Sequence, residues 1–417
     1  MLTRTSEQLA DIAHREQFHW HPQSRVFLHD NLLDFGIDPV GDGPVEMSLR
    51  HLHKAVHGGL GLRVSEAGIE VLPHALQPNF QCMTSGTTGP AKVVERSPAS
   101  WIASFSHNAR LFGLGPESHF AVLGQLSHSL SLYGVMEALH LGADIHILAG
   151  QRPDRQLAQL AKHQISLIYA TPTQLGSMID IAGERAVLSD VRHVLCGGGA
   201  LLASSKVRLK ALFPKADIIE FYGASETSFV TMADAMTPDG SVGKAYGGAH
   251  IDIRDTDGLI TKGVGQVWVK SPFLFDSYAV GKSDHTRWSK DGFLTVGELG
   301  VLDHHGYLFL KGRADRMVTI ADQNVHPEEI ETLIQNDLRV TRCCVLAVPD
   351  VKRGHSLVAI IEGPQNLSLA EDLITMLRRK LGPLKTPRRI LFHPNIPLRT
   401  AGKADLPCLR SWLETQT

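Results

Sequence analysis

The spacing of apolar positions in the first part of the chain is typical of alternating helices and strands. Residues 154–163 carry apolar side chains at helical spacing, and residues 165–170 form a continuous apolar run that the dipeptide 171–172 ends. Two further apolar runs, 193–196 and 217–221, each lead into a turn rich in small residues. This alternation predicts an α/β domain whose strands end at one cleft.

Beyond about residue 240 the pattern changes to short strands bounded by glycine, at 266–269 and 306–310. A short polar segment, 311–316, follows these strands. A chain of 417 residues is too long for one ordinary core. We therefore expect a large N-terminal domain of mixed α/β layers with a β-rich end, at 1–312, and a second domain at 313–417.

The second domain has a pattern of its own. Pro327 is placed to begin a helix, and residues 343–347 and 357–361 are two apolar strand candidates. Ser368 and Glu371 have the spacing of a capping box before a further helix. These elements predict a small, mobile α+β domain at the C-terminus.

Charge and hydropathy exclude several classes of protein. Lys plus Arg (41) nearly balance Asp plus Glu (43), so no strong overall field attracts nucleic acid or an anionic membrane. The chain opens on polar sequence without the apolar core of a signal peptide, and no stretch approaches the ~18 apolar residues of a membrane span. We therefore expect a cytoplasmic protein.

The cysteines and histidines do not form a recognisable metal-site pattern. No C-x-x-C pair is present, and an odd number of cysteines argues against a disulfide framework, so we expect reduced, buried thiols. The 22 histidines include adjacent pairs that lack third and fourth ligands at a usual spacing. The five cysteines are Cys82, Cys196, Cys343, Cys344 and Cys408.

A loop at residues 83–94 has the composition of a phosphate cradle. Its glycines let backbone N–H groups approach phosphate oxygens, its hydroxyls can donate to them, and Lys92 adds a positive charge. The loop is not a Walker A motif, because the residues after Lys92 continue as a strand rather than a helix. A glycine-rich hairpin turn is the plain alternative. The residues expected to hold phosphate are Thr84, Ser85, Gly86, Thr87, Thr88, Gly89 and Lys92.

This loop is similar to the phosphate-loop signature of the adenylate-forming superfamily, which contains acyl- and aryl-CoA synthetases, peptide-synthetase adenylation domains and luciferases. Further motifs of that superfamily follow in the expected order from residue 80 to the C-terminus. The resemblance implies that ATP and Mg²⁺ activate a small carboxylic acid as its acyl-AMP. The acyl group then passes to the thiol of coenzyme A or of a carrier-protein phosphopantetheine.

Motifs in the middle of the chain resemble the nucleotide site of that superfamily. His128 corresponds to the histidine between acyl pocket and nucleotide, although a lone histidine in an apolar run is more often a core residue. The small residues Gly198, Gly199 and Ala200 follow a strand, where they would let the backbone approach the flat base, or would simply form a tight turn.

The segment 220–227 is similar to the aromatic-Gly-x-Thr-Glu motif, with serine in place of threonine. The resemblance implies that Tyr222 stacks on adenine, that the Ser225 hydroxyl binds the α-phosphate, and that Gly223 belongs to the same nucleotide site. Glu226 would be the magnesium ligand, since a carboxylate oxygen suits that ion. Taken alone, a loop carboxylate is usually only solvated.

Three motifs near the domain boundary and beyond it complete the resemblance. Glu298 stands where the superfamily has the aspartate that binds the ribose hydroxyls, and Arg313 where an arginine contacts ribose or phosphate. Asp315 corresponds to the pivot of a hinge about which the small domain turns between the two half-reactions. Lys403 corresponds to the catalytic lysine. Without the resemblance, Glu298 would be read as an acidic residue at a β-turn, Arg313 and Asp315 as part of an ordinary linker, and Lys403 as part of a surface loop.

Two features depart from the pattern. Superfamily members usually carry well over a hundred residues before the phosphate loop, whereas Thr84 lies 83 residues from the start of this sequence. We expect part of the first N-terminal subdomain to be missing or compressed, which would mean an open acyl pocket, a homodimer that supplies the missing wall, or impaired activity. Asp322 stands where CoA ligases commonly have a glycine, so thioester formation is less firmly predicted than adenylation.

The leading interpretation is therefore an ATP-dependent acid–thiol ligase of the acyl- or aryl-CoA synthetase type. The alternatives are a stand-alone adenylation enzyme that loads an acyl carrier protein, and a non-catalytic nucleotide-binding scaffold. Candidate pocket residues around Tyr133 and 171–175 mix apolar and polar side chains, which suits either an aromatic acid or a medium acyl chain.

Overall fold

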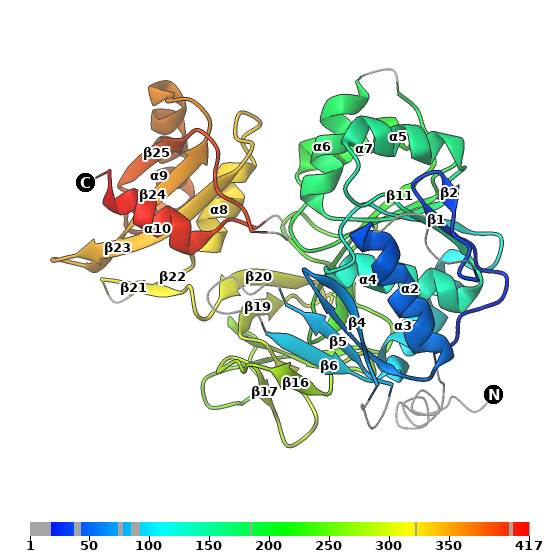
Figure 1. Cartoon of the computed structure of the whole chain (residues 1–417). Coiled ribbons are helices and arrows are strands. Elements are labelled where there is room, and N and C mark those ends of the chain that lie inside the picture. Colours follow the sequence, from blue (N-terminus) through cyan, green and yellow to red (C-terminus); the bar gives the residue numbers. More distant parts are fainter. Residues whose placement is uncertain are drawn as a thin grey trace.

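The computed structural model describes residues 18–36, 43–73, 78–84, 92–183, 186–321, 323–399 and 403–416. Within this part of the chain, three sheets and their helices form a large N-terminal domain, and a three-stranded sheet with three helices forms a smaller domain beside it (Figure 1). The fold class predicted from the sequence is confirmed. Strand β20 (Leu308–Arg313) ends where the domain boundary was placed, and the boundary itself stays a prediction.

The largest sheet has nine strands in the order β13-β12-β11-β10-β9-β7-β8-β1-β2. Neighbours from β11 to β1 run parallel, and antiparallel strands close both edges. The strands are β1 (Val26–Leu28), β2 (Asn31–Leu32), β7 (His119–Val122), β8 (Asp144–Ile147), β9 (Leu167–Ala170), β10 (His193–Cys196), β11 (Asp217–Ala224), β12 (Ser228–Met232) and β13 (Lys244–Ala245).

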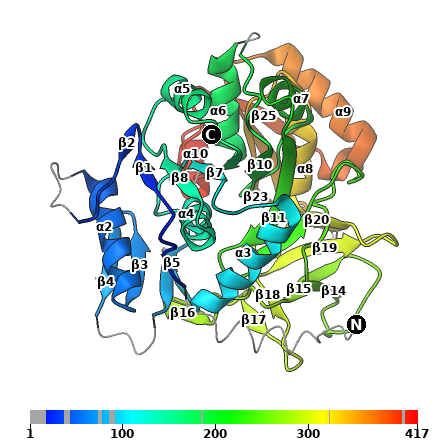
Figure 2. The ribbon, with the colours of Figure 1, turned by 90° about the vertical axis from the view of Figure 1, so that its right-hand side faces the viewer.

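Helices cover both faces of this sheet, which explains why its central strands are continuous apolar runs. Ile168 packs with the helices α5 (Pro153–Lys162), α6 (Pro172–Ala182) and α7 (Ala203–Leu212), whereas its neighbour Tyr169 packs on the side of α4 (Ser129–Leu141). Figure 2 shows the two sets of helices on either side of the strands. The predicted helix at 154–163 and the predicted strands are confirmed.

Two antiparallel-rich sheets complete the large domain. The five-stranded sheet consists of β3 (Gly61–Ser65), β4 (Gly68–Leu72), β5 (Phe80–Met83), β6 (Val93–Arg96) and β16 (Ser277–Val280). The six-stranded sheet consists of β14 (His250–Arg254), β15 (Gly265–Lys270), β17 (Arg287–Trp288), β18 (Leu294–Thr295), β19 (Glu298–Leu302) and β20. Helix α2 (Pro44–His57) packs on β4, and helix α3 (Pro98–Phe112) packs on α4. The predicted β-rich end is confirmed.

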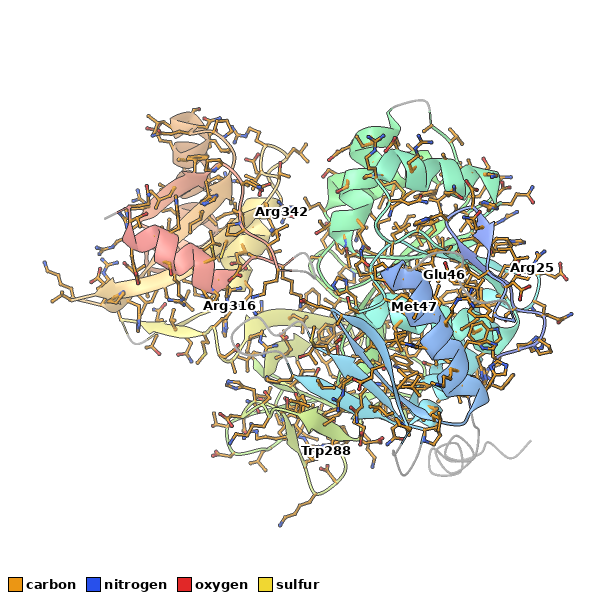
Figure 3. All side chains as sticks on the ribbon, viewed as in Figure 1. Arg25, Glu46, Met47, Trp288, Arg316 and Arg342 are labelled. Carbon is orange, nitrogen blue, oxygen red and sulfur yellow. The ribbon has the colours of Figure 1, made fainter. Side chains whose placement is uncertain are left out.

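The small domain has cores of its own, separate from those of the large domain. A short hairpin of β21 (Val318–Ile320) and β22 (Gln323–Val325) leads into it, and Arg316 just before this hairpin is labelled in Figure 3. Its other elements are α8 (Pro327–Gln335), β23 (Cys343–Asp350), β24 (Gly354–Glu362), α9 (Leu367–Lys385), β25 (Arg389–His393) and α10 (Leu406–Glu414).

Two sequence expectations are wrong in the small domain. The capping box at Ser368 and Glu371 does not form, because Asn366 is the N-cap of α9 and its side-chain oxygen accepts the Leu369 N–H at 3.0 Å. Four of the five cysteines are buried free thiols as expected, but Cys408 lies on the exposed side of α10. Within the described ranges, no helix is long and apolar enough to cross a membrane.

A buried carboxyl group lies between α3 and α4. Glu137 is fully buried and accepts hydrogen bonds from Asn108 Nδ2 at 2.8 Å, Tyr169 Oη at 2.5 Å and Tyr133 Oη at 3.3 Å. Burial raises its pKa to about 7, and the hydrogen bonds from Tyr169 and Asn108 oppose that rise. The folded protein therefore holds this group protonated over a pH range in which the unfolded chain ionises it.

We predict that Glu137→Gln changes how stability depends on pH. The wild-type carboxyl favours folding below its unfolded pKa of 4.5, and this contribution is lost as pH rises toward the folded pKa of about 7. The free energy of unfolding of the variant minus that of the wild type should therefore be about 3 kcal/mol more positive at about pH 8 than at about pH 5. Urea denaturation at both pH values measures this.

Glu117→Gln is the matched control, since Glu117 is exposed. The difference in free energy of unfolding between this variant and the wild type should be the same at both pH values. The assignment of a raised pKa to Glu137 fails if Glu137→Gln behaves like this control.

Candidate active site

A cavity of about 600 Å³ lies between the two domains and gathers residues from positions 66 to 405 of the chain. Its walls come from the ends of the parallel strands, from the β3–β4 turn and from the small domain. Most of the described residues that the sequence singled out line this cavity. They are Thr84, Lys92, His128, Gly198, Gly223, Ser225, Glu226, Glu298, Arg313 and Lys403.

The two ends of the phosphate-loop candidate sit at the cavity. Strands β5 and β6 pair antiparallel, and the Thr84 N–H donates to the Lys92 carbonyl oxygen at 2.8 Å. Lys92 Nζ lies 5.9 Å from the centre of the Tyr278 ring. The predicted strand after Lys92 is confirmed. The loop between these stems, with Ser85, Gly86, Thr87, Thr88 and Gly89, lies outside the described residues.

The turn between β11 and β12 brings two polar side chains to the cavity. A side chain at Gly223 would collide with the Ser228 carbonyl oxygen, so only glycine allows this tight turn. Ser225 Oγ lies 2.9 Å from Ser129 Oγ, and Glu226 Oε1 accepts a hydrogen bond from Tyr278 Oη at 2.7 Å. The turn therefore presents a hydroxyl and a carboxylate side by side.

His128 occupies the N-cap position of α4 and lines the cavity. Its Nε2 is buried and has no hydrogen-bond partner among the described residues. Burial lowers the pKa of the ring, and the charge of Glu66 opposes this only in part. His128 is thus a neutral imidazole near pH 7 at the wall of the cavity.

Sequence reasoning missed Arg96, which lies directly behind this turn. The side chain is 1% exposed, and its Nη2 donates to the Ser225 carbonyl oxygen at 2.6 Å. Its Nη1 donates to Ser228 Oγ at 2.8 Å and to Ser100 Oγ at 3.1 Å. The alternation of β6 could have revealed it, because Arg96 follows Val94 by two residues and so faces the same buried side.

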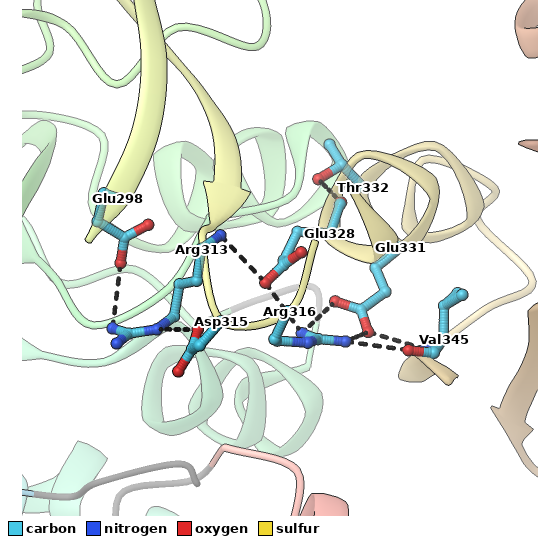
Figure 4. Close-up of polar contacts among 8 residues, drawn as sticks. All are labelled: Glu298, Arg313, Asp315, Arg316, Glu328, Glu331, Thr332 and Val345. Atoms are coloured by element: carbon cyan, nitrogen blue, oxygen red, sulfur yellow. Dashed lines mark hydrogen bonds and ion pairs between the residues drawn. The ribbon is translucent and has the colours of Figure 1, made fainter. Parts of the chain in front are cut away.

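An arginine links the cavity to the segment between the domains. Arg313 Nη1 lies 3.4 Å from Glu298 Oε1 in the large domain, and Arg313 Nε donates to Asp315 Oδ1 at 3.0 Å (Figure 4). Burial raises the pKa of Glu298, while the charges of Arg313 and Lys403 oppose the rise. Glu298 and Arg313, the candidates for ribose binding, and Asp315, the candidate hinge residue, therefore form one connected group of charges.

A second set of charges follows at the start of the small domain, also visible in Figure 4. Arg316 contacts Glu331 at 2.7 Å and Glu328 at 3.4 Å, and it donates to the Val345 carbonyl oxygen at 3.0 Å. These contacts fix the orientation of α8 and β23 relative to the segment that leaves the large domain.

Lys403 reaches the cavity from the small domain. It lies on a turn in which the Arg399 N–H donates to the Lys403 carbonyl oxygen at 2.8 Å. Solvent in the cleft touches its side chain, yet the surrounding walls desolvate the ammonium enough to lower its pKa, against the opposing charges of Glu298 and Glu226. The ammonium therefore faces two carboxylates of the large domain.

Not every candidate lines this cavity. Gly199, Ala200 and Tyr222 do not line it, and of the two neighbouring aromatic residues 221 and 222 it is Phe221 that does. The charges of Glu298 and Arg313 act on the buried Tyr222 hydroxyl, so Tyr222 is close to the ribose candidates. The roles of Gly199, Ala200 and Tyr222 in binding the adenine base stay predictions.

The donor set fits a magnesium ion that arrives with its nucleotide. No group of three or more metal-ligating side chains occurs among the residues that the structure describes. Mg²⁺ commonly takes one or two carboxylates together with substrate phosphates, and Glu226 offers one such carboxylate at the cavity.

Comparison with known proteins agrees with this arrangement. Residues 47–279 match the family model of the AMP-binding enzymes, and residues 329–403 match that of the AMP-binding enzyme C-terminal domain. The uncharacterized acyl–CoA ligase YhfT of Bacillus subtilis is 31% identical over 358 residues, which cover 84% of this chain and 72% of that protein.

Solved structures share the fold. The amide bond synthetase McbA of Marinactinospora thermotolerans is 26% identical, with a TM-score of 0.68 over 80% of this chain and 69% of that one. The O-succinylbenzoate coenzyme A synthetase of Bacillus subtilis, solved with ATP and magnesium, is 22% identical, with a TM-score of 0.70 over 79% and 69% of the two chains. The chain belongs to the family of AMP-binding enzymes.

Proposed function

We propose that this protein activates a small carboxylic acid with ATP and transfers the acyl group to the thiol of coenzyme A. The observation that carries this proposal is the position of Lys403, which shares one cavity with Glu226, Ser225 and the stems of the phosphate loop although it belongs to the other domain. Relatives named as acyl–CoA ligases support the same reaction.

In the first half-reaction, a carboxylate oxygen of the acid attacks the α-phosphorus of ATP, and pyrophosphate leaves. The residues act by position and charge: Lys403 neutralises charge that develops between the acid and the α-phosphate, and Ser225 donates to the phosphate. Glu298 accepts hydrogen bonds from the ribose hydroxyls, and Glu226 is the residue that would hold Mg²⁺. When bound, that ion neutralises phosphate charge.

In the second half-reaction, the thiol attacks the carbonyl carbon of the acyl-AMP and AMP leaves. We propose that the small domain turns about Asp315 between the two steps. Arg313 and Glu298 are cross-strand partners in the sheet of the large domain, so the contact that this rotation changes is the one between Arg313 and Asp315. Asp322, the second departure from the family pattern, lies outside the described residues.

Three narrower readings stay predictions. A carrier-protein phosphopantetheine is the alternative acceptor to coenzyme A, and a homodimer and a cytoplasmic location were expected from the sequence. A scaffold that binds nucleotide without turnover is a further alternative, against which the position of Lys403 argues.

We predict that purified protein given ATP, Mg²⁺, coenzyme A and a panel of aromatic, short and long acids forms acyl-CoA and pyrophosphate. Mass spectrometry of the thioester and a pyrophosphate assay measure the two steps separately. Chelation of Mg²⁺ should abolish both products. Pyrophosphate without acyl-CoA would favour a carrier protein as acceptor, and no turnover with any acid would contradict the proposal.

We predict that Lys403→Ala retains ATP binding but lowers the rate of pyrophosphate release at least ~100-fold, because it removes a charge that stabilises the transition state. Lys380→Ala is the matched control, since Lys380 is exposed on α9 of the same domain and does not line the cavity. Equal rates for the two variants would refute the role of Lys403.

We also predict that Glu298→Ala raises the KM for ATP by about tenfold or more, because a hydrogen bond to a charged acceptor contributes about 1.5–3 kcal/mol. Glu298→Asp keeps the carboxylate and should stay within a few-fold of wild type. Steady-state kinetics with varied ATP measure both, and an unchanged KM in Glu298→Ala would remove Glu298 from the ribose site.

A further inference from the structure

One wall of the cavity is aromatic. Trp101, Tyr133, Phe221 and Phe229 line it, and their rings contact one another with centroid separations of 4.4 to 5.5 Å. Aromatic walls of this kind bind flat apolar groups well. The body of an acid seated here would therefore lie against rings.

Ser228 places a hydroxyl in this wall with both of its lone pairs occupied. Its Oγ accepts a hydrogen bond from Arg96 Nη1 at 2.8 Å and another from Trp101 Nε1 at 3.2 Å. A guanidinium and an indole N–H are donors only, so neither can reverse its role. A serine hydroxyl has two acceptor sites and one proton, and the proton must therefore point in a third direction.

No atom of the described residues accepts that proton. The hydrogen bonds of Ser228 Oγ to Arg96 and Trp101 are incoming, and its contact to the cavity is the remaining open side. The backbone of Ser228 has φ +52° and follows the tight turn at Gly223, so the side chain is held at this place by the main chain as well as by its two donors.

A positive charge stands directly behind this hydroxyl. Arg96 is buried, and its hydrogen bonds go to hydroxyl and carbonyl oxygens, while the charges of Asp276 and Glu226 act on it from a greater distance. Burial lowers its pKa to about 10, which leaves the guanidinium charged at neutral pH. In a site of low dielectric, a hydroxyl that accepts from a cation becomes a stronger donor.

We propose that Ser228 is a specificity-determining donor, so that this enzyme selects an acid whose apolar, ring-like body carries a hydrogen-bond acceptor facing Ser228. The acceptor is a carbonyl, nitro or second carboxylate oxygen. This inference rests on the proposed function, because it takes the aromatic part of the cavity as the seat of the acid.

The test compares acids that differ only in the acceptor. Acetyl-substituted benzoates and phenylacetates carry a carbonyl oxygen where their isopropenyl counterparts carry a CH₂ group of the same shape. With the substituent at each ring position in turn, kcat/KM from pyrophosphate release gives one ratio for each pair. The wild type should favour the acetyl acid at least about tenfold at one position, as a hydrogen bond from a polarised donor implies.

Variants at two serines distinguish an effect of the hydroxyl at the cavity wall, Ser228, from an effect of the hydrogen bonds around Arg96 behind that wall. Ser228→Ala, or Ser228→Gly, which suits the positive φ, should bring the ratio to about one. Ser100→Ala is the matched control: Ser100 Oγ accepts from the same Arg96 nitrogen at 3.1 Å, but Ser100 is buried and does not line the cavity. This control should keep the wild-type ratio.

Trp101→Phe tests independently whether the direction of the Ser228 proton matters, since it removes one of the two donors to Ser228 Oγ and lets the hydroxyl rotate. The ratio of kcat/KM for the acetyl acid to that for the isopropenyl acid should fall in this variant, whatever change in KM the altered wall brings to both acids. If acids are turned over but the wild-type ratio is near one at every position, or if both Ser228 variants keep the ratio, the role of Ser228 is refuted and the proposed function stands. If none of these aryl acids releases pyrophosphate but a short or long acid does, the aromatic seat and the role of Ser228 are refuted and the proposed function stands. If no acid of any kind releases pyrophosphate, the proposed function itself fails.

Discussion

The arrangement of the site depends on one buried guanidinium. Arg96 ends the strand that follows the phosphate loop, and it binds the backbone of Ser225 and the side chain of Ser228 in the turn between β11 and β12. The end of β6 and the turn between β11 and β12, which lie far apart in the sequence, are thereby fixed relative to each other. Removing a charge from water is costly, and the carbonyl and hydroxyl oxygens around Arg96 offset that cost only in this geometry.

A second group of charges connects the site to the small domain. Glu298 belongs to a strand of the large domain, Asp315 to the segment between the domains, and Arg313 contacts both. Arg313 and Glu298 are cross-strand partners in the sheet of the large domain, so the contact that reaches the segment between the domains is the one between Arg313 and Asp315. Since hydrogen bonds between charged groups are strong but depend on geometry, this contact stabilises one orientation of the small domain without fixing it permanently. In that orientation Lys403 faces the carboxylates of the cavity.

Much of this could be predicted from the sequence, because the signals are local. The apolar run at β9, the strand at β10 and the helix that begins at Pro327 follow from periodicity and from proline, and the motif residues line one cavity as their order suggested. Ser228 carries no such signal. Its importance comes from two donors that are distant in the sequence, Arg96 and Trp101, and such tertiary contacts produce no residue pattern that could be recognised in the sequence.

The errors have a similar origin. Asn366 outcompetes Ser368 as a helix cap because its amide reaches the N–H of Leu369, a choice between neighbouring candidates that composition does not decide. Cys408 is exposed because it faces away from the core that Leu409 enters.

That exposed thiol has a practical consequence. The other four cysteines are buried in the cores, so a maleimide probe should attach to Cys408 in the unmodified chain. Cys408 lies on α10, three residues after Asp405 at the cavity wall, and moves with the small domain. A spin label or fluorophore there would report the rotation of that domain during turnover without engineering the sequence.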